Sequence, residues 1–157
     1  LPVRWNLATA KPVLGINPAE KLLTNGIRGS LKYSDFEWCS WTNNDSVSFT
    51  IDLLKPEVLN TLTLGCITNN GMAIHKPASV KVEVSDDNSN FREAAMQSFT
   101  PEEIFREGNF IENLPLKLGG TQGRYVRVSA KGPGVCPASH VRSGQASRIF
   151  FDEVMLE

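Results

Sequence analysis

The sequence predicts an all-β fold, in which short antiparallel strands form a β-sandwich or jelly roll within a single domain, residues 1–157. Three observations lead to this prediction. Apolar and polar residues alternate with a period of two in several runs, helical periodicity is nearly absent, and turn residues separate the runs. Short strands joined by turns and long loops are typical of sandwich architectures. The clearest turn signals are Asn25-Gly26, Asn70-Gly71, Asp86-Asp87-Asn88, Gly119-Gly120 and Gly132-Pro133-Gly134.

Six runs are predicted as strands, and in chain order they are 47–53, 59–67, 80–85, 110–118, 124–130 and 149–156. The fourth run is the weakest, because Pro115 cannot donate a hydrogen bond to a ladder. The last run is almost continuously apolar, and only the pair Asp152-Glu153 interrupts it. A carboxylate inside a core strand needs a partner, so this pair calls for a specific explanation.

The composition excludes several functional classes. The 157 residues carry a net charge of −1, which offers no electrostatic surface for nucleic acid or for an anionic membrane. No apolar run approaches the length of a membrane span. The three cysteines, Cys39, Cys66 and Cys136, are widely spaced and are expected to be reduced and mostly buried. The chain begins at Leu1 rather than at Met, which we interpret as a mature product or a piece of a longer protein.

Signals for catalysis are weak, and we predict that this domain is not an enzyme. The two histidines, His75 and His140, lie outside any nucleophile or metalloprotease motif. The acidic pair Glu102-Glu103 is better explained by a short helix over 101–107, which begins after an N-capping Thr100. No glycine-rich loop precedes a helix in the way that phosphate binding requires.

An aromatic segment is the first candidate for binding. Phe36, Trp38 and Trp41 precede the polar residues Asn43-Asn44-Asp45. An aromatic ring can stack on the apolar face of a sugar while neighbouring amides pair with its hydroxyl groups, so Trp41 and Asn43 are candidate sugar contacts. The alternative is that both tryptophans plug the end of the sandwich, since large aromatic side chains are usually well buried.

The segment from Asn25 to Ser30 is the second candidate. It contains two glycines and offers side-chain and carbonyl oxygens, and calcium takes six to eight oxygen ligands, many of them from the backbone. An ordinary solvated turn is the alternative explanation.

Several short motifs occur in a recognisable order. They are Asn6-Leu7-Ala8, Leu23-Thr24-Asn25-Gly26, Trp38, Phe49-Thr50-Ile51-Asp52-Leu53, the run 79–91, the run 123–128 and the run 149–154. Together they resemble the discoidin-like, or factor V/VIII C-type, domains, which include the galactose-binding-like carbohydrate-binding modules. The resemblance covers nearly the whole chain, and it implies a discoidin-like jelly-roll β-sandwich.

A narrower resemblance involves the run 25–30 and the run 134–137 together with His140. These residues are similar to the C-terminal domain of bacterial β-hexosaminidases, often described as chitobiases. The resemblance implies that a glycoside hydrolase lies elsewhere in the parent polypeptide, with its catalytic carboxylates outside this chain. It also implies a periplasmic, cell-surface or secreted protein.

The resemblance further implies a structural Ca²⁺ beside the first loop. Carried over residue by residue, its ligands are the carbonyl of Leu22, the side chain of Asn25, the carbonyl of Arg28, Ser30, the carbonyl of Asp152 and the side chain of Glu153. Asn25 replaces an Asp of the family and Ser30 replaces a Thr, so Glu153 is the only anionic ligand and weak binding is expected. The alternative for Glu153 is an ion pair with Arg28 or Lys21.

The sugar site of the family is altered in this sequence. Cys39 occupies the position of a characteristic His, and the run 68–76 contains His75 but no Arg. The expected sugar contacts are therefore Trp41, Asn43, His75 and His140. The leading hypothesis is a non-catalytic module that binds a glycan weakly and targets a hydrolase. The alternatives are a structural domain that packs on the parent hydrolase without binding glycan, and a protein-interaction module.

Overall fold

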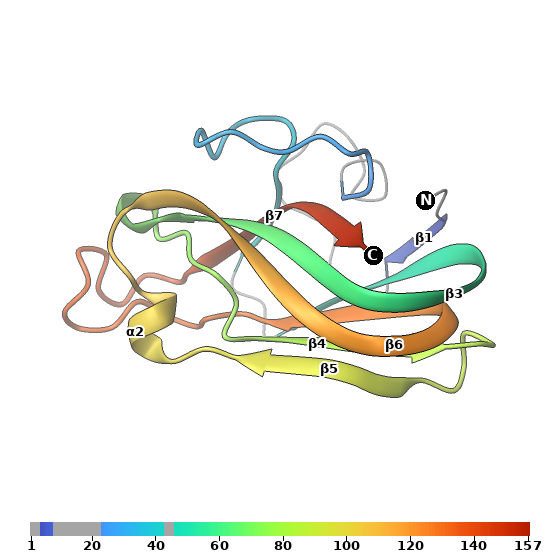
Figure 1. Ribbon diagram of the computed structural model, residues 1–157. Coiled ribbons are helices and arrows are strands. Elements are labelled where there is room, and N and C mark those ends of the chain that lie inside the picture. Colours follow the sequence, from blue (N-terminus) through green and yellow to red (C-terminus); the bar gives the residue numbers. More distant parts are fainter. Residues whose placement is uncertain (1–3, 8–22, 43–45) are drawn as a thin grey trace.

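The computed structural model describes residues 4–7, 23–42 and 46–157, and antiparallel strands dominate it (Figure 1). The strand order is β2-β7-β3-β6-β4-β5, and β1 pairs with β3 outside this path. The predicted all-β antiparallel fold is confirmed. The elements are β1 (Arg4–Leu7), β2 (Cys39–Thr42), β3 (Ser46–Asn69), the 3-10 turn η1 (Asn70–Met72), β4 (Ser79–Ser85), β5 (Arg92–Ser98), α2 (Pro101–Ile104), β6 (Asn109–Lys131) and β7 (Arg148–Leu156).

Two long strands, β3 and β6, connect the layers of the sandwich. Residues 46–52 of β3 pair with residues 125–131 of β6, and the same part of β6 also pairs with β4. Residues 57–69 of β3 pair with residues 109–123 of β6, and on the other side this part of β3 pairs with β7. Both long strands bend and twist between these halves (Figure 1). Each layer therefore contains one half of β3 and one half of β6.

The bend explains a difference from the predicted elements. The runs 47–53 and 59–67 are parts of one strand, and so are the runs 110–118 and 124–130. Leu54 has a φ of 69°, while Gly119 and Gly120 have φ values of 65° and 77°. The register between β3 and β6 shifts next to these residues. The Gly119-Gly120 signal therefore marks a bulge inside a strand rather than a turn between strands.

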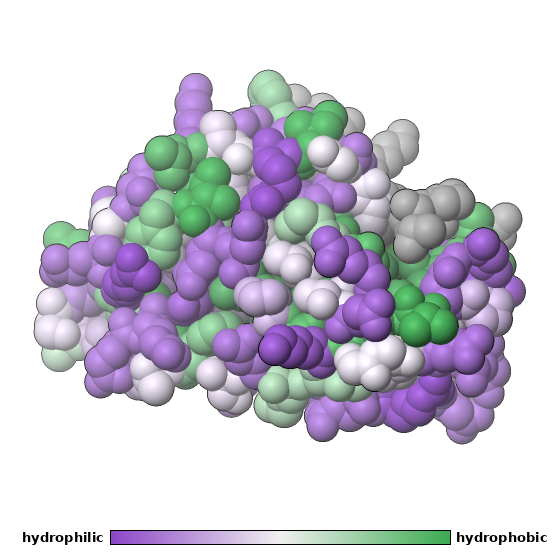
Figure 2. Space-filling model, viewed as in Figure 1, coloured by the Kyte–Doolittle hydropathy of each residue, from purple (hydrophilic) through white to green (hydrophobic). Residues whose placement is uncertain are grey.

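The alternating residues form the core as predicted. Val47, Phe49 and Ile51 of β3 and the valines at 80, 82 and 84 of β4 are fully buried. They belong to one large cluster, to which β6 and β7 also contribute. A smaller cluster contains Trp38, Ile67, Ile74 and Phe150. Figure 2 shows the corresponding exterior, where hydrophobic residues form separate patches among hydrophilic ones on this face.

The shorter elements agree in part with the sequence predictions. The helix is confirmed, although α2 ends at Ile104, and Thr100 closes a capping box with Glu103. The strands β1, β2 and β5 were not predicted. In β5 most side chains are exposed, so no alternation marks it as a strand. All three cysteines are free and buried. Among the described residues, no helix is long and apolar enough to span a membrane.

Candidate functional site

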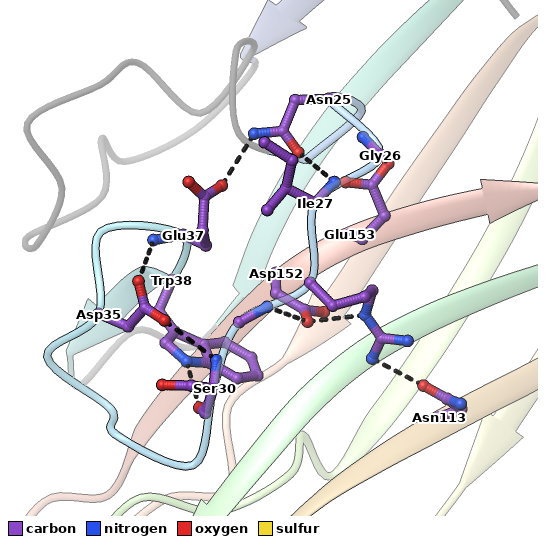
Figure 3. Close-up of polar contacts among 12 residues, drawn as sticks. Asn25, Gly26, Ile27, Ser30, Asp35, Glu37, Trp38, Asn113, Asp152 and Glu153 are labelled. Atoms are coloured by element: carbon purple, nitrogen blue, oxygen red, sulfur yellow. Dashed lines mark hydrogen bonds and ion pairs between the residues drawn. The ribbon is translucent and has the colours of Figure 1, made fainter.

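The candidate site around the 25–30 loop is centred on the acidic pair Asp152-Glu153 of β7 (Figure 3). Asp152 is fully buried and lies beneath the 25–30 loop. Its Oδ2 accepts a hydrogen bond from Arg28 Nε at 2.7 Å and another from the Gly29 amide at 2.9 Å. Arg28 also donates to Asn113 Oδ1 of β6 at 2.8 Å. This ion pair therefore joins the loop to β7, and it involves Asp152 rather than Glu153.

The indole of Trp38 supports the same loop from its other side. Its Nε1 donates to the carbonyl of Ser30 at 2.9 Å, and its ring lies against Gly29 so closely that no Cβ fits there. Asp35 Oδ2 accepts from the Ser30 amide at 3.1 Å. Hydrogen bonds from Ser30 lower the pKa of the Asp35 carboxyl group below its ordinary value. The loop is thus fixed by side chains from the segment that follows it and from β7.

Glu153 lies under the turn at Asn25 (Figure 3). Its Oε1 accepts from the Gly26 amide at 3.2 Å, while its Oε2 is buried without a hydrogen-bond partner among the described residues. Burial raises the pKa of this carboxyl group, and the Gly26 hydrogen bond opposes the shift. An anionic oxygen that is buried and unpartnered is unfavourable unless a proton or a cation compensates it.

Some of the expected calcium ligands offer an oxygen to a hard cation, and others already accept a hydrogen bond. A surface hollow is lined by residues 24–26 and 153–157, so Asn25 and Glu153 border the same space. The unpartnered Oε2 of Glu153 is an oxygen of the type that calcium prefers. The Asn25 Oδ1 caps the Ile27 amide at 2.8 Å, and the Ser30 Oγ accepts from the Lys32 amide at 3.2 Å, so each would share its oxygen with a cation. Leu22 lies outside the described residues.

A second group of polar side chains contains both histidines. Their Nε2 atoms are 3.2 Å apart, and the Oδ1 of Asn70 lies 3.1 Å from that of His75 and 2.6 Å from that of His140. The Nδ1 of His75 contacts the Ser147 hydroxyl group. Phe105, directly after α2, packs edge-on against both rings. The two histidines expected as sugar contacts are therefore brought together, but they are buried and face each other.

The buried position of His75 predicts a pH dependence of stability. Burial, followed by repulsion from His140, lowers the pKa of His75 from 6.5 to about 4. The described partners of the ring are Asn70, Ser147, His140 and Phe105, none of which carries a negative charge. The unfolded chain therefore binds a proton at His75 before the folded chain does, so stability is complete above pH 6.5 and falls as the pH drops toward 4.

We expect a loss of ~3 kcal/mol by pH 4, of which ~2 kcal/mol is reached by pH 5, because one pKa unit corresponds to about 1.4 kcal/mol. Urea unfolding at a series of pH values between 7.5 and 5, where most carboxylates stay ionised, measures it. A His75→Gln variant should lack this slope. The ring signals of His75 in NMR spectra should stay unchanged down to about pH 5, and a midpoint near 6.5 would contradict the prediction.

Trp41 does not provide an exposed stacking surface. It is 1% exposed and packs on Phe151 in the main core, with ring centroids 5.6 Å apart. Trp38 is equally buried, so the alternative in which both tryptophans fill the interior describes their positions. Asn43 lies outside the described residues. The exposed aromatic residue of this segment is Phe36, which is 60% exposed. Phe36 lies in the same segment of the sequence as the two tryptophans, and no pattern in that segment distinguishes the exposed ring from the buried ones.

Comparisons with known proteins agree with this architecture. The family model of the F5/8 type C domain matches residues 11–143. A CBM32 module from Clostridium perfringens, in complex with GalNAc-beta-1,3-galactose, is similar with 16% identity and a TM-score of 0.58, covering 98% of this chain and 94% of that one. The C-terminal domain of a chitobiase from Bacteroides fragilis is similar with 17% identity and a TM-score of 0.56, covering 98% and 92%. No curated protein matches the sequence.

A third similar structure contains two kinds of domain. It is a truncated AlyQ with CBM32 and alginate lyase domains, 15% identical with a TM-score of 0.54, and the match covers 98% of this chain and 31% of that one. The match therefore covers one part of a two-domain chain, and the family-model match agrees with the prediction that this domain is not an enzyme. The match of the family model over most of the sequence shows that the chain belongs to the F5/8 type C domain family.

Proposed function

We propose that this domain is a carbohydrate-binding module that holds an attached glycoside hydrolase close to its glycan. The observation that supports the proposal is the similarity over 98% of the chain to a module in complex with GalNAc-beta-1,3-galactose. A tethered module raises the local concentration of substrate around the enzyme without contributing to the chemistry. A shallow site that contacts one or two sugar rings gains little after ordering costs, so weak affinity is expected.

The parent enzyme that we propose is a β-N-acetylhexosaminidase of the chitobiase type. The similarity to the C-terminal domain of a chitobiase supports this choice, as do the motifs at 25–30 and 134–137. We also propose a periplasmic, cell-surface or secreted location, which the resemblance to the chitobiase domains implies.

A glycan array tests the binding function directly. We expect weak binding to β-linked amino sugars or galactosides, and we place Phe36 in the stacking role expected of Trp41, because its ring is exposed in the same segment. Phe36→Ala should weaken binding about ten-fold, the loss of ~1.4 kcal/mol of aromatic contact. Met96→Ala, which removes an exposed side chain from β5, is the matched control and should bind like the wild type. No binding by the intact domain would sink the proposal.

A second candidate function is a structural domain that packs on the parent hydrolase. The specific observation in its favour is that Trp41, His75 and His140 are buried rather than available to a sugar. The experiment that separates the two is to compare the parent enzyme with and without this domain. A structural role predicts a lower thermal stability after removal, with unchanged activity on a soluble substrate at low temperature. A targeting role predicts lost activity only on an insoluble or surface-bound glycan.

We also propose that a structural Ca²⁺ is held by Glu153 with oxygens of the 25–30 loop. Ca²⁺ in large excess over its dissociation constant should stabilise the fold by about 2–3 kcal/mol, which is ~5–10 °C in melting temperature for a domain of this size. Glu153→Gln should abolish this increase, while Glu93→Gln on β5 should keep it. Without Ca²⁺, Glu153→Gln should be no less stable than the wild type, because the amide removes a buried charge. Equal stabilisation of both variants in differential scanning calorimetry would contradict the proposal.

A further inference from the structure

A group of three metal-ligating side chains lies at one end of the sandwich and has no part in the glycan or calcium proposals. His75 follows η1, whereas Cys136 and His140 lie in the loop between β6 and β7. All three are buried, and their ligand atoms lie within 4.8 Å of one another. Phe105, next to α2, contacts both imidazole rings, and Figure 1 shows α2 and this loop at the same end of the molecule.

The separation of the two imidazoles suits a single metal ion. Two nitrogen ligands of a tetrahedral Zn²⁺, each about 2.0–2.1 Å from the metal, are ~3.3 Å apart. The Nε2 atoms of His75 and His140 are already 3.2 Å apart. The Oδ1 of Asn70 lies against both of them, at 3.1 Å and 2.6 Å. Three potential donor atoms therefore lie around one position, and the Cys136 thiol lies within 4.8 Å of a ring nitrogen of each histidine.

The partner of the second ring nitrogen of His75 favours the same arrangement. Ser147 Oγ donates to the carbonyl of Ala73 at 3.4 Å, so its oxygen is free to accept a proton from Nδ1 of His75. The lone pair of His75 is then on Nε2, the nitrogen that faces His140. Histidine ligands commonly donate their other N–H group in this way, which fixes the ring and its tautomer. A side-chain hydrogen bond also links Ser147 to the thiol of Cys136, so the same hydroxyl group borders two of the three side chains.

A proton on His140 occupies the space between the two imidazole rings. Its Nδ1 accepts a hydrogen bond from the Arg142 amide at 2.8 Å, so its neutral ring carries the proton on Nε2. That proton points toward Asn70 Oδ1 and His75 Nε2. One proton thus stands where a cation would bind. A metal on Nε2 requires this proton to move to Nδ1, which ends the hydrogen bond that Nδ1 accepts from the Arg142 amide.

We propose that His75 Nε2, His140 Nε2 and the thiolate of Cys136 form a Zn²⁺ site, with Asn70 Oδ1 beside the fourth position. Two imidazoles and one thiolate are a ligand set that suits Zn²⁺. Binding replaces the thiol proton of Cys136, which is released to solvent. The ion joins η1 to the loop between β6 and β7, and its role is to fix this end of the sandwich. The site is separate from the proposed glycan and calcium functions, and its test does not depend on either.

Cobalt substitution is the sharpest test. The purified domain, first stripped with a chelator, is titrated with Co²⁺ as a spectroscopic probe. We expect one equivalent to produce the visible bands of a tetrahedral ion together with a near-ultraviolet thiolate-to-cobalt band. Zn²⁺ should displace the Co²⁺ and remove both. Cys136→Ser should lose the thiolate band, and His140→Gln should weaken Zn²⁺ binding by at least about 100-fold, the upper end of losses seen for outer ligand partners. Val141→Gln, which changes an exposed neighbour of His140, is the control and should bind normally.

NMR of the wild-type domain keeps the proposal testable even if a variant fails to fold. His75 and His140 are the only histidines of the chain, so only two imidazole rings contribute nitrogen signals and both are expected to respond. One equivalent of Zn²⁺ should shift the Nε2 signal of both rings and the amide signal of Arg142. Absence of these shifts would overturn the proposal. So would a thiolate band that persists in Cys136→Ser, or tight Zn²⁺ binding that persists in His140→Gln.

Discussion

Replacing Gly29 by alanine is expected to destabilise the domain by about 3 kcal/mol or more. A Cβ at this position would lie 2.3, 2.5 and 2.7 Å from the indole atoms Cε2, Nε1 and Cζ2 of Trp38. The indole is rigid and buried, and it cannot swing away without losing its hydrogen bond to the Ser30 carbonyl. The backbone cannot retreat freely either, because the Gly29 amide donates to Asp152. Overpacking of this kind is among the costlier single substitutions.

The measurement is the urea midpoint of unfolding, followed by tryptophan fluorescence. Gly71→Ala is the matched control, because its new Cβ would have only one neighbour, Asn69 Oδ1, at an ordinary 3.7 Å. Its midpoint should stay close to that of the wild type. If Gly29→Ala and Gly71→Ala unfolded at the same urea concentration, the close packing of Trp38 on the loop would be refuted.

Replacing Asp152 by alanine is expected to cost about 3–5 kcal/mol of folding stability. Asp152 is fully buried, and its carboxylate holds both Arg28 and the Gly29 amide. Removal of one partner of a buried ion pair leaves the other charge and the backbone donor without compensation. The side chain of Arg28 is 34% exposed, so water can solvate its guanidinium group once Asp152 is removed. The cost is therefore expected toward the lower end of this range.

Chemical denaturation in a chelator isolates this effect from any bound cation. Asp86→Ala is the control, because Asp86 pairs with Arg92 at 3.6 Å on the surface, and such pairs contribute at most ~1 kcal/mol. Asp152→Asn should fall between the two, since it keeps the side-chain volume but weakens the bond to Arg28. A loss for Asp152→Ala no greater than that for Asp86→Ala would show that the buried pair does not stabilise the loop.

Much of the fold was predictable, because alternation survives wherever one face of a strand is buried. The valines of β4 and the Val47–Leu53 part of β3 follow this rule. The rule fails in β2, where four residues are too few to show a period, so no strand was predicted around Trp41. It also fails in β5, whose two faces are mostly exposed. In both cases the strand depends on its neighbour rather than on its own pattern.

The sites were harder to predict because they depend on contacts between distant segments. The interruption at Asp152-Glu153 correctly marked carboxylates inside a core strand. No pattern indicated that Arg28 would form its ion pair with Asp152 rather than with Glu153. His75 and His140 were each predicted as a sugar contact, without any indication that they touch. Their contact with each other, and with Cys136, depends on how the loop between β6 and β7 packs on η1, and no local signal encodes that packing.

The position of β7 in the sheet has a consequence for synthesis on the ribosome. β7 lies between β2 and β3, so Cys39 of β2 pairs with Phe151 across most of the described chain. At the usual rate of about 5–20 residues per second, β2 emerges ~5–20 seconds before its partner exists. Until then β2 has no neighbouring strand and the 25–30 loop lacks Asp152 beneath it. The nascent domain therefore exposes unpaired strand edges until β7 has left the exit tunnel, and we expect it to become resistant to proteases only then.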